Sequence, residues 1–326
     1  MSNFSILKEK VKNLPIGVMA TLLSVITLSN VFSTLGFNLL RHFAVNVGAL
    51  IIIAGFCKLF LYPKKVFSEL NDTSLASIYP TFCMSIMLMA AYYVNYNYTL
   101  GKSLWTIALI LNTLLVIIFT WNNLIKKFEY AKFLPPFWVA YVGIIVSVIT
   151  SPAMNEPIIA KIIFYFSCSA YFIILPFMIY RLFTKPVTGA PYPTLAIMAA
   201  PPSLCIVAYL TLFKDANVYI TLFLYSIVFI MTIYMYTRFP KIFRMKFIPT
   251  FAGITFPLAI STLATFKVST FMESIGQLNF ALILREFGSI ELVIACAGIL
   301  FVVYNFTKIF FSLFEYKNTE NELTTN

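Results

Sequence analysis

Long apolar stretches alternate with short polar links along the whole chain, and each stretch is long enough to cross a membrane. The hydrocarbon core of a bilayer, about 30 Å thick, takes about 20 residues of helix. Ten such segments can be marked out, which predicts an all-α membrane protein with ten transmembrane helices. The expected helices cover residues 15–36, 40–61, 77–97, 102–122, 134–152, 158–182, 193–212, 216–237, 248–268 and 288–311.

A proline opens every second segment. These residues are Pro15, Pro80, Pro136, Pro193 and Pro249, at intervals of 65, 56, 57 and 56 residues. One interval of this length holds two crossings, so the repeat unit is a helical hairpin. Because each repeat has an even number of crossings, successive hairpins enter the membrane from the same side. Five parallel hairpins can close into a pseudo-fivefold ring with one helix of each hairpin inside.

The proline-led segments differ in composition from their partners. Once Lys267 is assigned to the loop after the ninth segment, they contain no Asp, Glu, Lys or Arg, and they are rich in small and hydroxyl residues. The eighth segment is far bulkier, as a lipid-facing helix can be. Small residues let helices approach closely or leave room at an axis. We therefore expect the odd helices to line a central pore, although tight packing without a pore explains the same composition.

The charges set the orientation. Only 11% of the residues are charged against 60% hydrophobic, and the ten crossings sort the 23 Lys and Arg residues 17 to 6, with the larger group on the side of the N-terminus. The positive-inside rule then places both termini in the cytoplasm, and we expect a multi-pass protein of the cell (plasma) membrane. The net charge of +11 is largely explained by this bias, so no nucleic-acid partner is predicted. Attraction of anions or acidic lipids is the other interpretation.

The expected organisation is one ten-helix transmembrane domain over residues 15–312. A cytoplasmic N-terminal segment, residues 1–14, precedes it, and a cytoplasmic tail, residues 313–326, follows it. The first hydrophobic segment follows three lysines as a signal peptide would. The repeat needs this segment, however, so we expect it to be retained as the first helix.

Few residues suit enzyme chemistry. The five cysteines are spread singly, as small packing residues are, and the lone His42 cannot build a histidine metal cluster. Motifs for zinc proteases, serine hydrolases and phosphate loops are absent from the sequence. We therefore expect no enzyme activity, no metal and no cofactor. Glu291, near the outer end of the tenth segment, is read as an interfacial charge close to Arg285.

The prolines suggest where an anion would be favoured. Proline fits the first turn of a helix, where its missing N–H would have no partner, and the N-terminus of a helix carries partial positive charge. Five such cytoplasmic helix starts would point at one vestibule and favour an anion there. Pro201, Pro202 and Pro257 lie deeper and should kink their helices, either to shape a pore or simply to fit the packing.

One level of the ring is a candidate constriction. Seven residues beyond each repeat proline, about 10 Å along a helix, stand Leu22, Met87, Gly143, Ala200 and Phe256. If all five point inward, Phe256 fills the centre of an apolar constriction, which gates by blocking or dewetting. As one of 34 phenylalanines, it is equally well read as a core or lipid-facing residue.

Three segments resemble a known family. The string IPTFAGITFPLAISTLAT from Ile248 to Thr265 resembles the ninth helix of the tellurite-resistance/dicarboxylate transporter (TDT) family, which includes the plant slow-type anion channels. The string PTLAIMAAPPSLCIVAYL from Pro193 to Leu210 looks like the seventh helix of that family. The opening Leu14-Pro15-Ile16-Gly17 is similar to its Leu-Pro-x-Gly start.

The resemblance implies a homotrimer in which each protomer carries its own pore, with Phe256 as the pore gate. The chain departs from bacterial members at Ala20-Thr21-Leu22, where these often carry Gly-Ile-Pro. It also lacks the mid-helix prolines of some third and fifth helices, with Cys83 and Val139-Ala140 in the aligned regions. These departures bear on the shape of the pore and hence on the substrate.

The leading prediction is an anion channel or transporter that moves small inorganic or organic anions across the bilayer. The alternative is a proton-linked or exchange transporter of C4-dicarboxylates or of tellurite- or sulfite-like oxyanions. The absence of ionisable side chains inside the expected inner helices argues against tight proton coupling.

Overall fold

Ten helical segments of membrane-spanning length make up the described chain. The computed structural model describes the backbone of residues 3–324 and the side chains of residues 7–311, so the outermost residues of both expected terminal segments lie outside it. Residues 3–324 contain helices and no strand. Ten of the segments are long and apolar enough to cross a membrane. The all-α fold with ten candidate spans is therefore confirmed.

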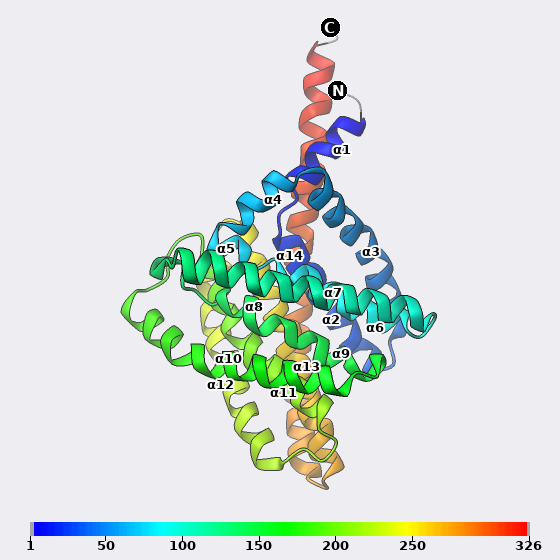
Figure 1. The fold of residues 1–326 in the computed structure, drawn as a ribbon, viewed down its shortest axis with the longest axis vertical. Helices are drawn as coiled ribbons and strands as arrows, with labels where there is room; N and C mark the ends of the chain where they lie inside the picture. Colours follow the sequence, from blue (N-terminus) through cyan, green and yellow to red (C-terminus); the bar gives the residue numbers. More distant parts are fainter. Residues whose placement is uncertain (1–2, 325–326) are drawn as a thin grey trace.

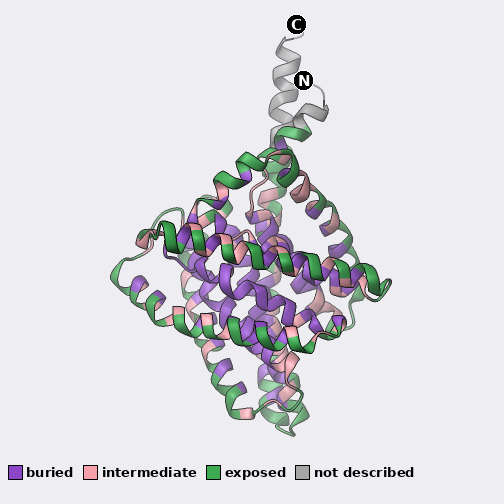
Figure 2. Cartoon of the chain, viewed as in Figure 1, coloured by how far each residue is buried: buried purple, intermediate pink, exposed green. Residues whose placement is uncertain are grey.

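The five odd-numbered spans form the inside of the molecule. In the most apolar 18 residues of each of these spans between 67% and 83% are buried, against 22% to 33% for the even-numbered spans, and Figure 2 shows this buried centre enclosed by exposed outer helices. The inner spans consist of α2 (Gly17–Thr34); α5 (Thr73–Ala76) with α6 (Pro80–Tyr93); α8 (Phe137–Val142), η3 (Gly143–Ile145) and α9 (Val146–Met154); η4 (Tyr192–Ala199) with α11 (Ala200–Leu212); and η5 (Pro249–Phe251) with α13 (Ala252–Ser274).

The outer spans are single long helices, most of them longer than the inner ones. They are α3 (Asn38–Leu61), α7 (Tyr98–Phe119) with the π-helical end η1 (Thr120–Lys126), α10 (Pro157–Thr184), α12 (Val218–Ile242) and α14 (Leu278–Thr324). The helices α1 (Asn3–Lys12) and α4 (Pro63–Leu70) and the short turn η2 (Tyr130–Lys132) lie outside the spans. Helix α1 and the last turns of α14 lie at the same end of the molecule (Figure 1).

Contacts between the spans follow a simple order. Each inner span packs against the outer span that comes next in the sequence. The inner spans also contact one another in a closed sequence, from α2 to α6, α9, α11, α13 and back to α2. Five inner helices therefore surround a common interior.

Each repeat proline stands at or directly next to the start of a helix in an inner span, or within two residues of it. Pro80 is the first residue of α6 and Pro249 the first of η5, while Pro193 is the second residue of η4. Pro136 directly precedes α8, and Pro15 lies two residues before α2, where its carbonyl accepts a hydrogen bond from the Val18 N–H (3.0 Å). The chain loses no backbone hydrogen bond at such positions, because the first N–H groups of a helix have no partner within it.

The ends of the last two spans differ from the expectation. Helix α13 continues to Ser274 rather than ending at residue 268, and α14 begins at Leu278, ten residues before the expected start at 288. Only a tight turn separates them, with Gly276 at φ +80°. The charged residues in this region pair across the turn, Arg285 Nη2 lying 2.5 Å from Glu273 Oε2. Charge therefore does not mark the helix ends here.

With these helix ends, two ionisable residues lie well inside the membrane-spanning helices. Lys267 belongs to the inner helix α13, so the expectation that all inner helices are free of charge is wrong. Glu291 lies 13 residues into α14, about 20 Å along the helix, and is only 1% exposed. The reading of Glu291 as an interfacial charge is therefore also wrong.

Ion pairs join the short segments at the end of the molecule where the inner helices begin. Lys58 near the end of α3 bonds Glu69 of α4 (2.8 Å) and the carbonyl of Leu14 (2.9 Å). Asp72 caps α5 by accepting from the Ser74 and Leu75 N–H groups and pairs with Lys132 (2.9 Å). The loops after α3 and η1 are thus tied to the inner helices.

The pKa of Asp72 reflects this arrangement. Burial alone raises the pKa, but the bond from Lys132 and those from the two N–H groups outweigh it, so the pKa of the carboxyl lies below its usual value. A carboxyl whose pKa is lower in the folded protein stabilises the fold above its unfolded pKa, and this contribution disappears as the pH falls.

We therefore expect Asp72→Asn, which keeps the cap but removes the charge, to destabilise the protein by up to about 1 kcal/mol at neutral pH. The difference from the unsubstituted protein should shrink as the pH falls below the ordinary Asp pKa of about 4. Thermal unfolding in detergent, at neutral pH and at a pH below about 4, measures this difference in stability. Lys132→Gln removes this pair and also the longer one to Glu129 (3.3 Å), so it should lose at least as much stability at neutral pH. A penalty for Asp72→Asn that does not change with pH would contradict this account.

Candidate functional site

A small cavity lies among the inner helices, and every inner span contributes to its wall. Its volume is about 40 Å³, which is room for a few water molecules. The contributing residues include Ala20 of α2, Met84 of α6, Gly143 of η3, Ala200 of α11 and Phe256 of α13. The cavity is therefore the place where the closed sequence of inner helices leaves space.

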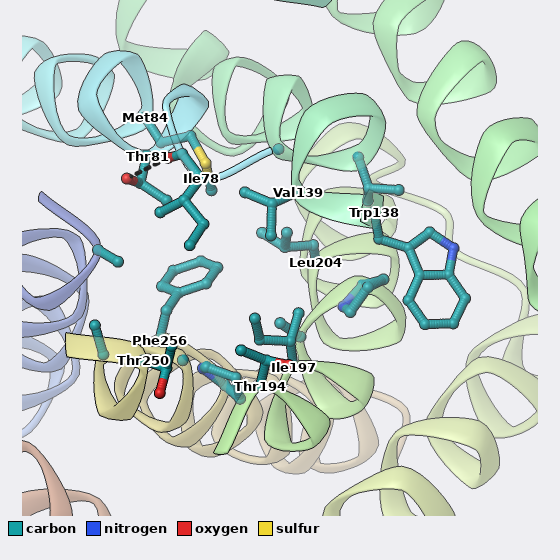
Figure 3. Close-up of a pocket in the computed structure, with 18 of the residues that line it drawn as sticks. Ile78, Thr81, Met84, Trp138, Val139, Thr194, Ile197, Leu204, Thr250 and Phe256 are labelled. Atoms are coloured by element: carbon teal, nitrogen blue, oxygen red, sulfur yellow. Dashed lines mark hydrogen bonds between the residues drawn. The ribbon is translucent and has the colours of Figure 1, made fainter. Parts of the chain in front are cut away.

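Phe256 occupies this cavity. Its side chain leaves α13 and its ring extends across the space toward Ile78, in the short link between α5 and α6 (Figure 3). Only 7% of the residue is exposed. Met84 and Leu204 stand on the far walls in the same view. The ring thus separates the side chains of opposite inner helices.

The residue next to Phe256 fixes α13 against α2. The Ser24 hydroxyl donates to Ala20 O and lies 2.7 Å from Thr255 Oγ1, and the Thr255 hydroxyl lies 2.8 Å from the carbonyl of Ala252. Both side chains are fully buried. A hydrogen-bonded contact between two inner helices therefore holds the backbone from which the Phe256 ring projects.

The expected constriction level is only partly reproduced. Gly143, Ala200 and Phe256 line the cavity, but Leu22 and Met87 are not among its lining residues. Leu22 instead packs toward α3, where a Cβ added to Gly48 would come within 2.8 Å of its Cδ1. Met87 is fully buried.

The physical reason is the mixture of helix types. Between the repeat proline and this level lie the 3-10 segments η4 and η5 in the spans of Pro193 and Pro249, whereas the path from Pro136 to Gly143 follows the α-helix α8. A 3-10 helix turns 120° and rises about 2.0 Å per residue, against 100° and 1.5 Å in an α-helix. Equal steps along the sequence therefore reach different heights and directions, and Ala20 and Met84 reach the cavity in place of Leu22 and Met87.

The wall of the cavity has no charged side chain. Its three threonine hydroxyls, on Thr81, Thr194 and Thr250, each donate to a backbone carbonyl at 2.7 Å, those of Ile78, Pro191 and Ala190. Their hydrogens therefore do not point at the cavity. A surface of this kind offers no nucleophile and no acid or base, but it can admit or exclude a small solute.

The inner prolines shape this wall. Pro201 and Pro257 line the cavity, whereas Pro202 is buried beside it. Pro201 and Pro202 follow Ala200 in the first turn of α11, where the 3-10 helix η4 changes to an α-helix. Pro257 lies inside α13. Proline has no backbone N–H to donate within a helix. Two of these three prolines, Pro201 and Pro257, line the cavity.

A second hollow lies toward the other end of the inner helices. It has a volume of about 440 Å³ and is lined by two lysines, Lys214 and Lys267, together with the ends of α11 and α13. Lys267 Nζ donates to Thr211 Oγ1 (3.2 Å). Among residues 7–311 neither lysine pairs with a carboxylate. Lys267 follows Phe256 by 11 residues, about 16 Å along the helix.

Glu291 lies buried between three helices. It projects from α14, and Thr265 of α13 and the tyrosines Tyr225 and Tyr236 of α12 are close enough to interact with it. Neither carboxyl oxygen has a hydrogen-bond partner among the described residues. The Thr265 hydroxyl donates to Ser261 O and accepts from Tyr225. A buried carboxyl without a partner is costly, so it calls for a functional reason.

Comparison with known families decides the identity. The family model described as "voltage-dependent anion channel" (SLAC1) matches residues 13–307. The chain belongs to this family. The match confirms the resemblance to the tellurite-resistance/dicarboxylate transporters and plant slow-type anion channels. A comparison with curated proteins finds no match.

Membership in the SLAC1 family makes this chain a multi-pass membrane protein that moves anions across the bilayer. The family consists of channels and transporters rather than enzymes. In the described residues no three His, Cys, Asp or Glu side chains gather as metal ligands would.

Sequence reasoning missed several residues that the structure brings to these sites. Ala20, Met84 and Thr194 line the cavity, and nothing in their sequence context distinguishes them from neighbours that face other helices. Lys267 carried a usable signal, since it is a lone cation within an otherwise apolar segment. In membrane helices such a residue usually faces the protein interior or a water-filled space.

Proposed function

We propose that the five inner spans enclose an anion pore within each protomer and that the ring of Phe256 closes it. The observation that carries this proposal is the position of the Phe256 ring inside a chargeless cavity to which all five inner spans contribute. A space of about 40 Å³ does not pass a hydrated anion. The pore is therefore closed in this conformation, and it opens when the ring leaves the axis.

The proposed selectivity has two sources. The proline-led helix starts direct positive dipole ends toward one mouth of the pore. Lys214 and Lys267 place two cations without carboxylate partners at the other. The chargeless middle adds no fixed charge that would trap an ion, and an apolar constriction can gate by dewetting.

Orientation and assembly belong to the same proposal. The 17 to 6 distribution of Lys and Arg supports cytoplasmic termini and a plasma-membrane location, with residues 1–14 and 313–326 flanking the domain formed by residues 15–312. The family resemblance supports a homotrimer in which each protomer has its own pore. Chloride and nitrate, and larger anions such as malate, sulfite or tellurite, are the candidate substrates, which flux measurements in proteoliposomes would distinguish.

A proton-linked transporter of C4-dicarboxylates or oxyanions is the second candidate, and the buried Glu291 carboxyl favours it. The carboxyl is 1% exposed and contacts the helix that carries Phe256. A side chain of this kind inside a membrane protein is a typical carrier of a coupled proton. Such a transporter would load and release one proton at Glu291 in each cycle.

Phe256→Ala should raise the anion conductance of the reconstituted protein about tenfold or more, which corresponds to removing at least ~1.4 kcal/mol from the barrier. Planar-bilayer recording measures it. Phe164→Ala is the matched control, because Phe164 is also 7% exposed but projects from the outer helix α10, away from the cavity. An unchanged current in correctly assembled Phe256→Ala protein would refute the gate.

Lys267→Gln, introduced in the open Phe256→Ala background, should lower the anion current roughly twofold at low ionic strength, and the difference should fade in high salt as the charge is screened. Current–voltage curves at two salt concentrations test this. Lys161→Gln removes an exposed cation from α10, far from the hollow in sequence, and should have no effect. Equal currents for Lys267→Gln and Lys161→Gln would show that Lys267 does not contribute to the anion pathway.

Glu291→Gln separates the two candidate functions. In a proton-linked transporter this substitution abolishes anion uptake driven by a pH gradient, because the amide cannot carry a proton. In a channel it leaves the current of the Phe256→Ala background unchanged, and a pH gradient alone drives no uptake. Radiolabelled malate uptake with an imposed pH gradient, measured beside the bilayer current, gives the answer. Loss of the bilayer current together with the uptake would contradict both assignments.

A further inference from the structure

A crevice between the outer helices α10 and α12 is separate from the pore cavity. Its volume is about 580 Å³, and its floor is formed by η4 and the link before it. Successive residues on one side of η4, Tyr192, Leu195 and Met198, line the crevice. Thr194 and Ile197 line the pore cavity instead. Since side chains three apart align in a 3-10 helix, η4 presents one face to each space.

One end of the crevice carries two cations. Arg238 and Lys241 stand one turn apart near the end of α12 and line the crevice together. The Arg238 guanidinium lies 4.4 Å from the ring centroid of Tyr234, and Lys241 Nζ lies 4.3 Å from that of Tyr192. Each aromatic ring favours a cation over its face, so the two charges are held at the crevice.

No carboxylate among the described side chains neutralises these cations. Among the described side chains neither Arg238 nor Lys241 forms an ion pair. The Nε of Arg238 is enclosed by the protein and has no acceptor. Two like charges at this spacing repel each other, and an enclosed donor without an acceptor is unfavourable. A phosphate between the two side chains would relieve the repulsion between their charges, whereas the enclosed Nε is out of its reach.

The rest of the crevice is apolar and open to the membrane. Its walls are hydrocarbon side chains of α10 and α12, among them Ile179, Leu182 and Ile230. Phe183 at its edge is 82% exposed and Ile230 is 60% exposed. Because α12 ends at Ile242, the cations stand at the depth of the headgroups, and the apolar part lies beside the acyl chains.

We propose that this crevice binds an anionic phospholipid, with its phosphate between Arg238 and Lys241 and an acyl chain along Ile179, Leu182 and Ile230. A soluble anion would make no favourable contact with the apolar part of the crevice. A neutral lipid would leave the cations uncompensated. The bound lipid would contact η4, the helix whose other face lines the pore cavity. The binding site does not depend on the proposed gate, because lipid retention is measured without any ion flux.

Native mass spectrometry of the purified full-length protein with added phosphatidylglycerol or phosphatidylcholine tests the proposal. We expect the unsubstituted protein to retain phosphatidylglycerol preferentially, and the double variant Arg238→Gln/Lys241→Gln to retain it roughly tenfold less. The control Lys64→Gln/Lys65→Gln removes the same charge from exposed positions of α4 and should retain the lipid. Equal retention by both double variants would overturn the site.

Two further arms identify the ligand. Ile230→Trp, which fills the apolar half and keeps both cations, should also weaken retention of phosphatidylglycerol, whereas retention unaffected by this variant would reject the acyl-chain part. Inorganic phosphate at millimolar concentration should not displace the lipid. Displacement by phosphate alone, or a change of oligomeric state in place of lipid loss on Arg238→Gln/Lys241→Gln, would show a free-anion site or a subunit contact and overturn the proposal.

Discussion

The hydrocarbon interior of a bilayer offers no hydrogen-bond partner, and the architecture of this protein follows from that constraint. Every backbone N–H and C=O at that depth has to be satisfied within the chain, which accounts for a fold made of helices throughout the described residues. The breaks in the inner helices obey the same rule. The 3-10 segments η3, η4 and η5 all lie in the buried inner spans, where neighbouring helices rather than lipid surround them.

The constraint also explains how the inner helices can be rich in hydroxyl residues without being polar toward the cavity. Ser24, Ser85, Thr150, Ser203 and Thr262 each donate to the carbonyl four residues earlier. A hydroxyl bonded in this way needs no outside partner. The helices thereby gain small side chains that permit close packing, and their surface stays nearly neutral. In the five inner spans the charged side chains are Lys267 and Glu273, both in the last part of α13.

Helix η4 connects two parts of the molecule that the sequence does not link. Its three-residue period places Leu195 toward the outer crevice and Thr194 and Ile197 toward the pore cavity. An α-helix at this position would rotate these faces out of register within two turns. The change of helix type at Ala200 is thus what lets one short segment form a wall of both spaces.

The number of candidate spans and the division into buried and exposed helices could be predicted from the sequence, because apolar length and residue size are properties of each segment by itself. Family membership could be predicted too, because the sequences of three helices resemble those of the family. The tertiary structure decided the rest. The expected helix ends at residues 268 and 288 left Glu273 and Arg285 in a loop, whereas in the structure these residues belong to α13 and α14 and pair across a tight turn.

Leu22 and Met87 stand as many residues after a repeat proline as Phe256 does, but their side chains do not reach the cavity. The direction of a side chain at this distance depends on how many of the preceding residues are 3-10 rather than α. Which side chains meet at a cavity is set by helix rotation and by contacts between segments far apart in the chain. No periodicity within a single segment contains that information.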